Sequence, residues 1–291
     1  MTTSMLVSPN RGRKIESAVA TGFMVLAFLV MLVPLVMIVG YVIQRGAGTI
    51  SWHFVTADLP IIDRSADGGI GPAVVGTLLI VGVATLLAVP LGVLGGIYLN
   101  EYGGKSRAAA VVRFLADVMT GVPSIVMGLF IYTIWVLRFK NQSAFAGTLA
   151  LGCLMLPVII RTTEEVLRLV PSDQRDASYA LGGRKATTIG RVVVPAAVPG
   201  MMSGALLAVA RAAGETAPLL FTIGFATKVN TNLFHGPNVA LPSLIFRNAT
   251  SPFPAAQDLA WGAALTLIVI VFVFTLLARL VAARFDRRSR A

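Results

Sequence analysis

Residues 196–225 read AAVPGMMSGALLAVARAAGETAPLLFTIGF, an apolar stretch that carries only two charged side chains, Arg211 and Glu215. A membrane-spanning helix needs about 17–25 predominantly apolar residues. A charged side chain at the bilayer centre costs about 2.5–3.5 kcal/mol on insertion scales. The stretch therefore predicts a membrane helix whose two charges serve a polar task at membrane depth.

Five further apolar runs are long enough to span a membrane. The six runs lie at residues 18–43, 72–99, 111–137, 144–160, 196–225 and 259–283. The 291-residue chain is 56% hydrophobic and 13% charged, whereas soluble domains carry about 25% charged residues. The first run is longer than a signal-peptide core, so we expect it to be retained as a helix. The sequence predicts an all-α integral membrane protein with six spans.

The basic residues predict the topology. Of the 24 Lys and Arg residues, seventeen fall in segments on the same side as the N-terminus and six on the opposite side. Because basic residues concentrate in cytoplasmic loops, both termini are expected to be cytoplasmic. We expect an N-terminal tail at 1–17, a transmembrane domain at 18–283 with a cytoplasmic loop at 161–195, and a basic tail at 284–291. The net charge of +11 then reflects topology and contact with lipid rather than nucleic-acid binding.

Several kinds of chemistry are not expected of this chain. Cys153 is the only cysteine in the sequence, and His53 and His235 lie far apart, so neither a disulfide nor a metal site is predicted. Residues 104–106, Gly-Lys-Ser, resemble the end of a P-loop, but the leading glycine would fall at position 99, which is Leu99. We expect no catalysis and no cofactor in this chain.

The predicted inner loop at 161–195 is too long for a simple turn, which needs about 2–8 residues. Pro171 and Ser172 predict a helix start with Ser172 as N-cap, and Gly182-Gly183 predict its end. An amphipathic surface helix without a partner is one interpretation of this segment.

The loop also has a recognisable spacing. Asp176-Ala177-Ser178 is followed by three residues, Gly182, nine residues and Val192-Val193-Val194-Pro195. This resembles the EAA loop of bacterial ABC importer permeases, with Asp in place of Glu, Ser in place of Ala, and Val in place of Ile and Leu. The resemblance implies docking on a cytoplasmic ATPase through Asp176, Ala177, Ser178, Tyr179, Ala180, Leu181 and Gly182.

Four further segments narrow the resemblance. They are GVPSIV at 121–126, LPVIIRTTE at 156–164, YALG at 179–182 and AVARAAGETAPLL at 208–220. From the first span onward the chain is similar to PstA-type permease subunits of bacterial phosphate ABC importers. This implies a type I importer permease fold in the bacterial cytoplasmic membrane. The implied partners are a related PstC-like permease, a PstB-like ATPase dimer that binds ATP and Mg, and an extracytoplasmic PstS-like phosphate-binding protein.

Arg211, Glu215 and Thr216 are the expected substrate-pathway residues. The planar guanidinium of Arg suits an oxyanion such as phosphate, and Glu215 at i+4 can hold Arg211 when no anion is present. Gly214 and Pro218 weaken the helix, so we expect freed backbone amides to face the ion. A purely structural ion pair, or a clamp on a neighbouring subunit, is the alternative interpretation.

Two other charged residues have competing interpretations. The resemblance places Arg161 near the exit of the pathway, although snorkelling of a terminal Arg explains it equally well. Asp117 is expected to pair with Arg113, four residues earlier, and Gly121 and Pro123 are expected to kink the third span.

Three other functions remain open. The nearest is a permease for another oxyanion, such as molybdate or sulfate. An intramembrane enzyme using Glu215, Asp117 and Arg211, or a secondary transporter driven by an ion gradient, would have no need of the 161–195 loop.

Overall fold

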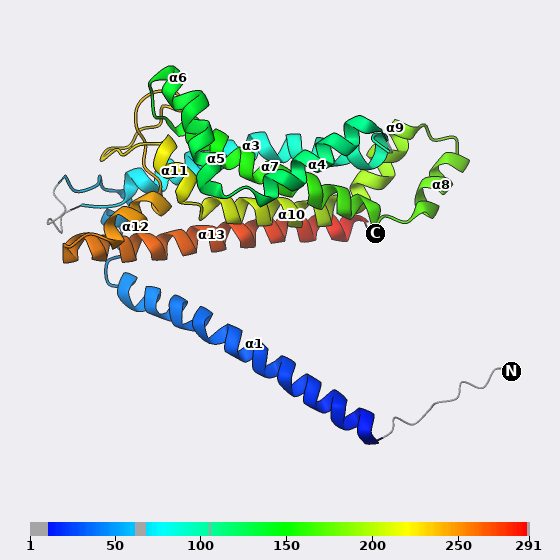
Figure 1. The fold of residues 1–291 in the computed structure, drawn as a ribbon, viewed down its shortest axis with the longest axis horizontal. Helices are drawn as coiled ribbons and strands as arrows, with labels where there is room; N and C mark the ends of the chain where they lie inside the picture. The colour runs from blue at the N-terminus through cyan, green and yellow to red at the C-terminus, as the bar shows by residue number, and fades with distance from the viewer. Residues whose placement is uncertain (1–10, 62–67, 105, 290–291) are drawn as a thin grey trace.

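The computed structural model describes residues 11–61, 68–104 and 106–289, and this part of the chain is helical throughout apart from its turns and connections (Figure 1). The long helices are α1 (Arg11–Gly46), α3 (Gly71–Ile97), α4 (Arg107–Gly121), α7 (Ala144–Arg168), α10 (Val194–Ala213) and α13 (Pro254–Ser289). The shorter helices are α2 (Trp52–Thr56), α5 (Ser124–Ile131), α6 (Leu137–Phe139), α8 (Ser172–Ala180), α9 (Lys185–Thr188), α11 (Ala217–Thr222) and α12 (Leu241–Ala249). Three π-helical turns are η1 (Tyr98–Tyr102), η2 (Tyr132–Val136) and η3 (Ile189–Val193).

Five stretches of helix within the described residues are long and apolar enough to cross a membrane. They are Lys14–Gly46, Gly71–Tyr102, Ala144–Arg168, Lys185–Ala213 and Pro254–Leu276. A sixth span is reached if Arg107–Gly121 and Ser124–Phe139, which meet at a bend of 107°, are counted together as one broken span. The predicted all-α fold is confirmed, and the kink expected at Gly121 and Pro123 lies at this bend.

The structure differs from the predicted runs at several boundaries. The fifth run is divided, because α10 ends at Ala213 and α11 begins at Ala217. Pro218 lies in the first turn of α11, where its missing N–H costs no helical hydrogen bond. Helix α7 continues to Arg168, about two turns into the predicted 161–195 loop, and α13 continues to Ser289 through most of the predicted tail.

Helix α7 lies at the centre of the bundle, between α3 and α10, which are its most extensive partners. Small residues allow the backbones to approach closely. A Cβ added to Gly96 of α3 would lie 2.5 Å from Cβ of Thr163, and one added to Gly204 of α10 would lie 2.5 Å from Oγ1 of Thr162. Such contacts are typical of membrane helices, which associate by close packing because lipid supplies no hydrophobic force between them.

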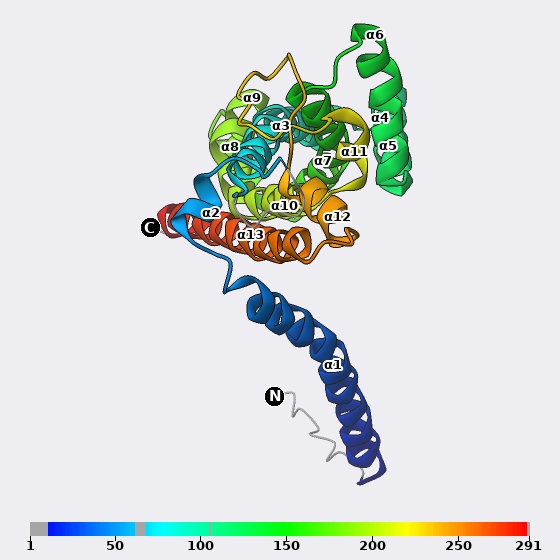
Figure 2. The same ribbon diagram turned by 90° about the vertical axis from the view of Figure 1, so that its left-hand side faces the viewer.

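The two ends of the bundle hold different elements. Helices α8 and α9 lie at one end, together with the C-terminal part of α13, while α2, α6 and α12 lie at the other (Figure 1). Helix α1 leans away from the bundle and stays close to it only at its C-terminal end (Figures 1 and 2). There Tyr41 packs edge-on against Trp261 of α13, with ring centroids 5.1 Å apart.

Candidate functional site

A cavity of about 210 Å³ lies where the α4–α5 bend meets α7 and α10. It is lined by Met119, Thr120, Val122, Pro123, Ser124, Leu154, Met155, Val158, Ala208, Arg211, Ala212 and Glu215. Met155 and Val158 lie near the middle of α7, so the cavity lies near mid-height of that span. A site for one water needs about 10–15 Å³, so the cavity has room for a small ion with water.

Arg211 and Glu215 meet at this cavity, as the sequence predicts, but their ion pair is loose. The distance from Arg211 Nε to Glu215 Oε1 is 3.7 Å, and the two side chains are 72% and 19% exposed. A charge-assisted hydrogen bond would be about 2.7–2.9 Å long. The guanidinium is therefore available to other acceptors. A charge exposed at this depth has to face water, an anion or another protein rather than lipid.

The chain breaks its helix within this pair, because α10 ends at Ala213 and Glu215 lies between α10 and α11. The N–H groups of Gly214 and Glu215 donate to the carbonyls of Arg211 and Ala212, at 3.1 and 3.2 Å. The helix is interrupted at Gly214, the position where the sequence predicts it to be weakened. The expectation of freed backbone amides is wrong for these two residues, because the last turn of α10 tightens and keeps both bonded.

Thr216 and Arg161 take other positions, and among the described residues neither lines the cavity. Thr216 is half-buried at the start of α11, and its carbonyl accepts from the N–H groups of Leu219 and Leu220. Arg161 lies on α7 one turn beyond Val158, on the side toward α8. Their assignment to the substrate pathway stays a prediction.

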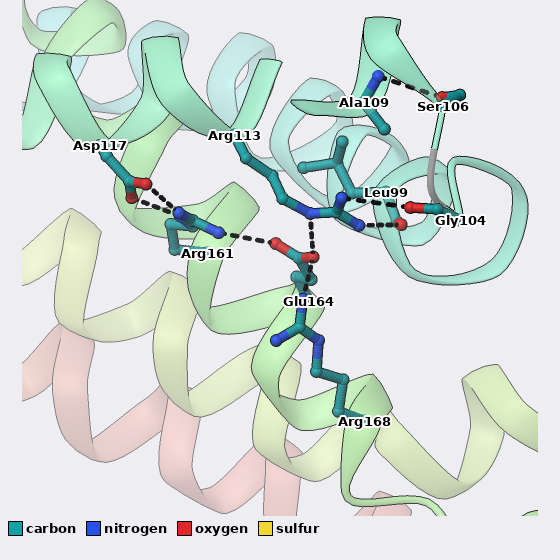
Figure 3. Close-up of polar contacts among 9 residues, drawn as sticks. All are labelled: Leu99, Gly104, Ser106, Ala109, Arg113, Asp117, Arg161, Glu164 and Arg168. Atoms are coloured by element: carbon teal, nitrogen blue, oxygen red, sulfur yellow. Dashed lines mark hydrogen bonds and ion pairs between the residues drawn. The ribbon is translucent and has the colours of Figure 1, made fainter. Parts of the chain in front are cut away.

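A second group of charges lies between the cavity and the α8 end of the bundle, around Glu164 (Figure 3). The side chain of Glu164 is only 1% exposed. Its Oε1 accepts from Arg113 Nε at 2.7 Å and from Arg168 Nη2 at 2.6 Å, and its Oε2 accepts from Arg161 Nη1 at 3.0 Å. We call Glu164 with these three arginines the Glu164 cluster. A carboxylate this deeply buried is stable because charged donors satisfy both of its oxygens.

The cluster corrects one prediction. Asp117 pairs with Arg161 through both carboxylate oxygens, and not with Arg113, which turns to Glu164 instead (Figure 3). The packing of α4 against α7 makes these inter-helix partners available, and a spacing rule within one helix does not include them. Sequence reasoning did not single out Glu164. The available signal was its spacing from Arg161 and Arg168 at i−3 and i+4, which places all three on one helical face.

The short helix predicted within the inner loop is present as α8. Its N-cap is Pro171 and not Ser172, so the predicted cap is one residue too late, and no side chain caps this end. Gly182 takes a positive φ of 79°, its N–H donates to the Tyr179 carbonyl, and the Gly183 N–H donates to the Ser178 carbonyl, both at 2.9 Å. These two bonds form a Schellman motif, so the predicted glycine stop is confirmed.

The segment expected to dock on an ATPase is largely open to solvent. Asp176, Ala177, Tyr179, Ala180, Leu181 and Gly182 are exposed, and Ser178 is half-buried. Leu181 is 90% exposed. A large apolar side chain held in this way at the tip of a capped helix is suited to a protein contact.

Known proteins resemble this chain in sequence. Residues 88–291 match the family model described as binding-protein-dependent transport system inner membrane component. Phosphate transport system permease protein PstA 1 of Mycobacterium tuberculosis is 46% identical over 281 residues, which cover 96% of this chain and 91% of that protein. The permease protein PstA of Haemophilus influenzae is 37% identical over 268 residues, which cover 92% of this chain and 94% of that protein.

Solved structures resemble it in fold. A chain of a bacterial ABC transporter involved in alginate import superposes with a TM-score of 0.61 at 14% identity, covering 93% of this chain and 99% of that chain. A chain of the inward-facing MetNI methionine ABC transporter gives 0.57 at 16% identity, covering 75% and 94%. At these identities the likeness concerns the fold alone. Because the family model covers most of the chain and the relatives are this similar, the chain belongs to the family of binding-protein-dependent transport system inner membrane components, together with the phosphate transport permeases named PstA.

Proposed function

We propose that this chain is a permease subunit of an ATP-driven importer of inorganic phosphate, and that its cavity forms part of the translocation pathway. The observation that carries the proposal is Arg211, a largely exposed guanidinium on a cavity near mid-height of the bundle. The names of the PstA relatives supply the expected cargo.

Phosphate suits the groups on this cavity. The Arg211 guanidinium can donate to phosphate oxygens, and Thr120 and Ser124, which carry hydroxyl groups, line the same cavity. Glu215 adds an acceptor. Phosphate near neutral pH carries at least one O–H that can donate to this carboxylate, whereas sulfate and molybdate are fully ionised and would be repelled by it. A site that hydrogen-bonds a substrate O–H discriminates against analogues that lack it.

The proposal includes the other parts of the importer. The exposure of Arg211 leaves one side of the pathway to be closed by a second, PstC-like permease. Helix α8 and Leu181 dock on a PstB-like ATPase dimer, which binds ATP and Mg and performs the hydrolysis, so this chain is not itself an enzyme. A PstS-like phosphate-binding protein docks at the opposite end, near α2 and α12. Both termini, like α8, are then cytoplasmic.

Reconstitution tests the proposal. The chain, purified with a partner permease and ATPase and placed in liposomes with a phosphate-binding protein, should take up phosphate and hydrolyse ATP in response to it. Sulfate and molybdate, each supplied with its own binding protein, are the competing cargoes. Uptake by liposomes holding this chain alone, or uptake driven by an ion gradient without ATP, would contradict the assignment.

A substitution at Glu215 tests the selectivity argument. Glu215→Gln removes the charge that repels fully ionised oxyanions but keeps the size of the side chain. We expect discrimination between phosphate and sulfate to fall by roughly tenfold, which corresponds to about 1.4 kcal/mol. Glu165→Gln is the control, because Glu165 is exposed on α7 and does not line this cavity. Unchanged selectivity in Glu215→Gln would show that the preference for phosphate is set elsewhere, for instance by the binding protein.

A further inference from the structure

Within the described residues, two side chains of α8 hydrogen-bond to other elements, and the helix also packs against α9 and η3. Seven of its nine residues are exposed, and the two that are half-buried are Arg175 and Ser178. The helix lies beyond the end of the bundle (Figure 1). Any displacement of α8 that moves the membrane helices has to pass through these contacts or through the chain on either side of α8.

Arg175 makes the stronger of the two connections. Its Nη1 donates to the Val170 carbonyl at 2.6 Å, and its Nη2 donates to the Leu167 carbonyl and to Glu101 Oε1, both at 3.0 Å. The side chains of Arg175 and Glu101 are 20% and 8% exposed. Asn100 Nδ2 donates to the same Glu101 oxygen at 2.8 Å. The planar guanidinium therefore fixes α8 at once to the end of α7 and to the π-helical turn η1.

A second arginine, Arg113, also binds the turn η1. Arg113 of α4 donates through Nη2 to the Leu99 carbonyl at 2.7 Å and through Nη1 to the Gly104 carbonyl at 3.3 Å (Figure 3). Its Nε donates to Glu164 of α7. Arg113 binds Leu99 and Arg175 binds Glu101, two residues further along the chain. The two arginines therefore hold neighbouring residues of one short turn. Turns of π-helix inside longer helices are frequent at functional sites.

We propose that Arg175 is a positioning residue that transmits the displacement of α8 to the cavity, through η1, Arg113 and α4. Helix α4 carries Met119 and Thr120 into the cavity wall, so a shift of η1 that is passed on by Arg113 moves that wall. The inference rests on the proposed function, in which α8 is docked on an ATPase. Packed elements with discrete arrangements amplify small shifts of this kind.

The second connection offers a built-in comparison. Ser178 Oγ lies 2.8 Å from Thr188 Oγ1 of α9, which continues through η3 into α10 and thus towards Arg211. This bond joins two neutral hydroxyl groups, whereas the Arg175–Glu101 bond joins two charges, and charge-assisted bonds are about twice as strong. The charged connection is therefore expected to carry more of the coupling.

The test uses the complete complex in liposomes and measures phosphate taken up per ATP hydrolysed. Glu101→Gln weakens the link without altering the surface of α8, so the ATPase should stay bound. We expect uptake per ATP to fall by about 5- to 150-fold, the usual range of coupling between sites. Arg175→Gln should do the same. The double variant Arg175→Glu with Glu101→Arg should restore part of the ratio. Thr188→Val removes the bond to Ser178 from the α9 side and leaves the docking surface of α8 unchanged, so it should stay near wild type.

The outcomes separate this inference from the proposed function. Wild-type uptake per ATP in Glu101→Gln, or an equal loss in Thr188→Val, would overturn the role of Arg175. A loss in Glu101→Gln that comes only from dissociation of the ATPase would overturn it as well, because the link would then serve assembly. If the wild-type complex itself shows no phosphate-dependent hydrolysis, the proposed function fails instead.

Discussion

Arg211–Glu215 and the Glu164 cluster are both arginine–carboxylate groups in membrane-spanning segments, yet they differ in distance, burial and number of partners. The first is a single pair at 3.7 Å with the arginine 72% exposed. In the second, three arginines lie 2.6–3.0 Å from a carboxylate that is 1% exposed. The cluster joins α4 to α7, whereas the pair joins residues that are one turn apart.

This difference indicates two tasks. An exposed arginine in a long ion pair gives up little interaction free energy when another anion replaces its carboxylate. It is therefore suited to binding a substrate that moves on. A buried carboxylate that accepts from three guanidinium groups cannot be removed without breaking the ion pair that joins α4 to α7, so it is suited to holding helices in register. Charge in a membrane helix therefore does not by itself mark a transport site, and the tightness of the pairing has to be examined.

The largest effect is expected when the tight group is broken. Glu164→Ala leaves three arginines without their shared acceptor and should destabilise the protein by about 3–5 kcal/mol. Thermal unfolding of the purified complex in detergent measures the loss. Glu165→Ala is the matched control, because the neighbouring Glu165 is exposed and its removal should change stability by less than about 0.5 kcal/mol. Equal stability of the two variants would refute the structural role of the cluster.

The loose pair should show the opposite behaviour, with a large change in transport and a small one in stability. A hydrogen bond to a charged group contributes about 1.5–3 kcal/mol, so Arg211→Ala should reduce phosphate uptake by roughly ten- to a hundredfold. Its unfolding temperature should stay near wild type. Arg211→Lys should assemble normally and still transport poorly, since an ammonium lacks the planar fork. Normal uptake in Arg211→Ala would remove this residue from the pathway.

The smallest effect is expected at Asp117, which is 57% exposed although it pairs with Arg161 through both oxygens. Exposed pairs contribute little to stability, and in Asp117→Asn the guanidinium of Arg161 keeps Glu164 as a partner. The same unfolding assay should place this variant close to wild type. If Asp117→Asn lost as much thermal stability as Glu164→Ala, the solvent exposure of the side chains would be a poor guide to the strength of these ion pairs.

Much of the helical fold could be predicted from the sequence, because the length of an apolar run depends on the thickness of the bilayer. The pairing of Arg211 with Glu215 was predictable for a similar reason, since the two residues are four apart in one segment. The end of α8 at Gly182-Gly183 was predictable as well, because few residues other than glycine tolerate a φ of 79°.

The Glu164 cluster and the Arg175–Glu101 link could not be predicted in this way. Arg113 and Glu164 are 51 residues apart, and Arg175 and Glu101 are 74 apart. Only the packing of α3, α4 and α7 brings them together. A rule for neighbours within one helix instead assigned Asp117 to Arg113, and it failed because a partner on the adjacent helix offered two bonds.

The 107° bend between α4 and α5 has a consequence for biogenesis. Peptide groups at a break cannot satisfy one another as they do in a continuous helix, and hydrocarbon offers them no substitute. Gly121 and Pro123 are exposed on the surface of this chain, so water or a neighbouring protein has to cover the break before the segment is stable in the bilayer. Newly synthesised chain lacking its partner should therefore stay sensitive to protease between residues 121 and 124 longer than elsewhere, and a time course of limited proteolysis would measure this.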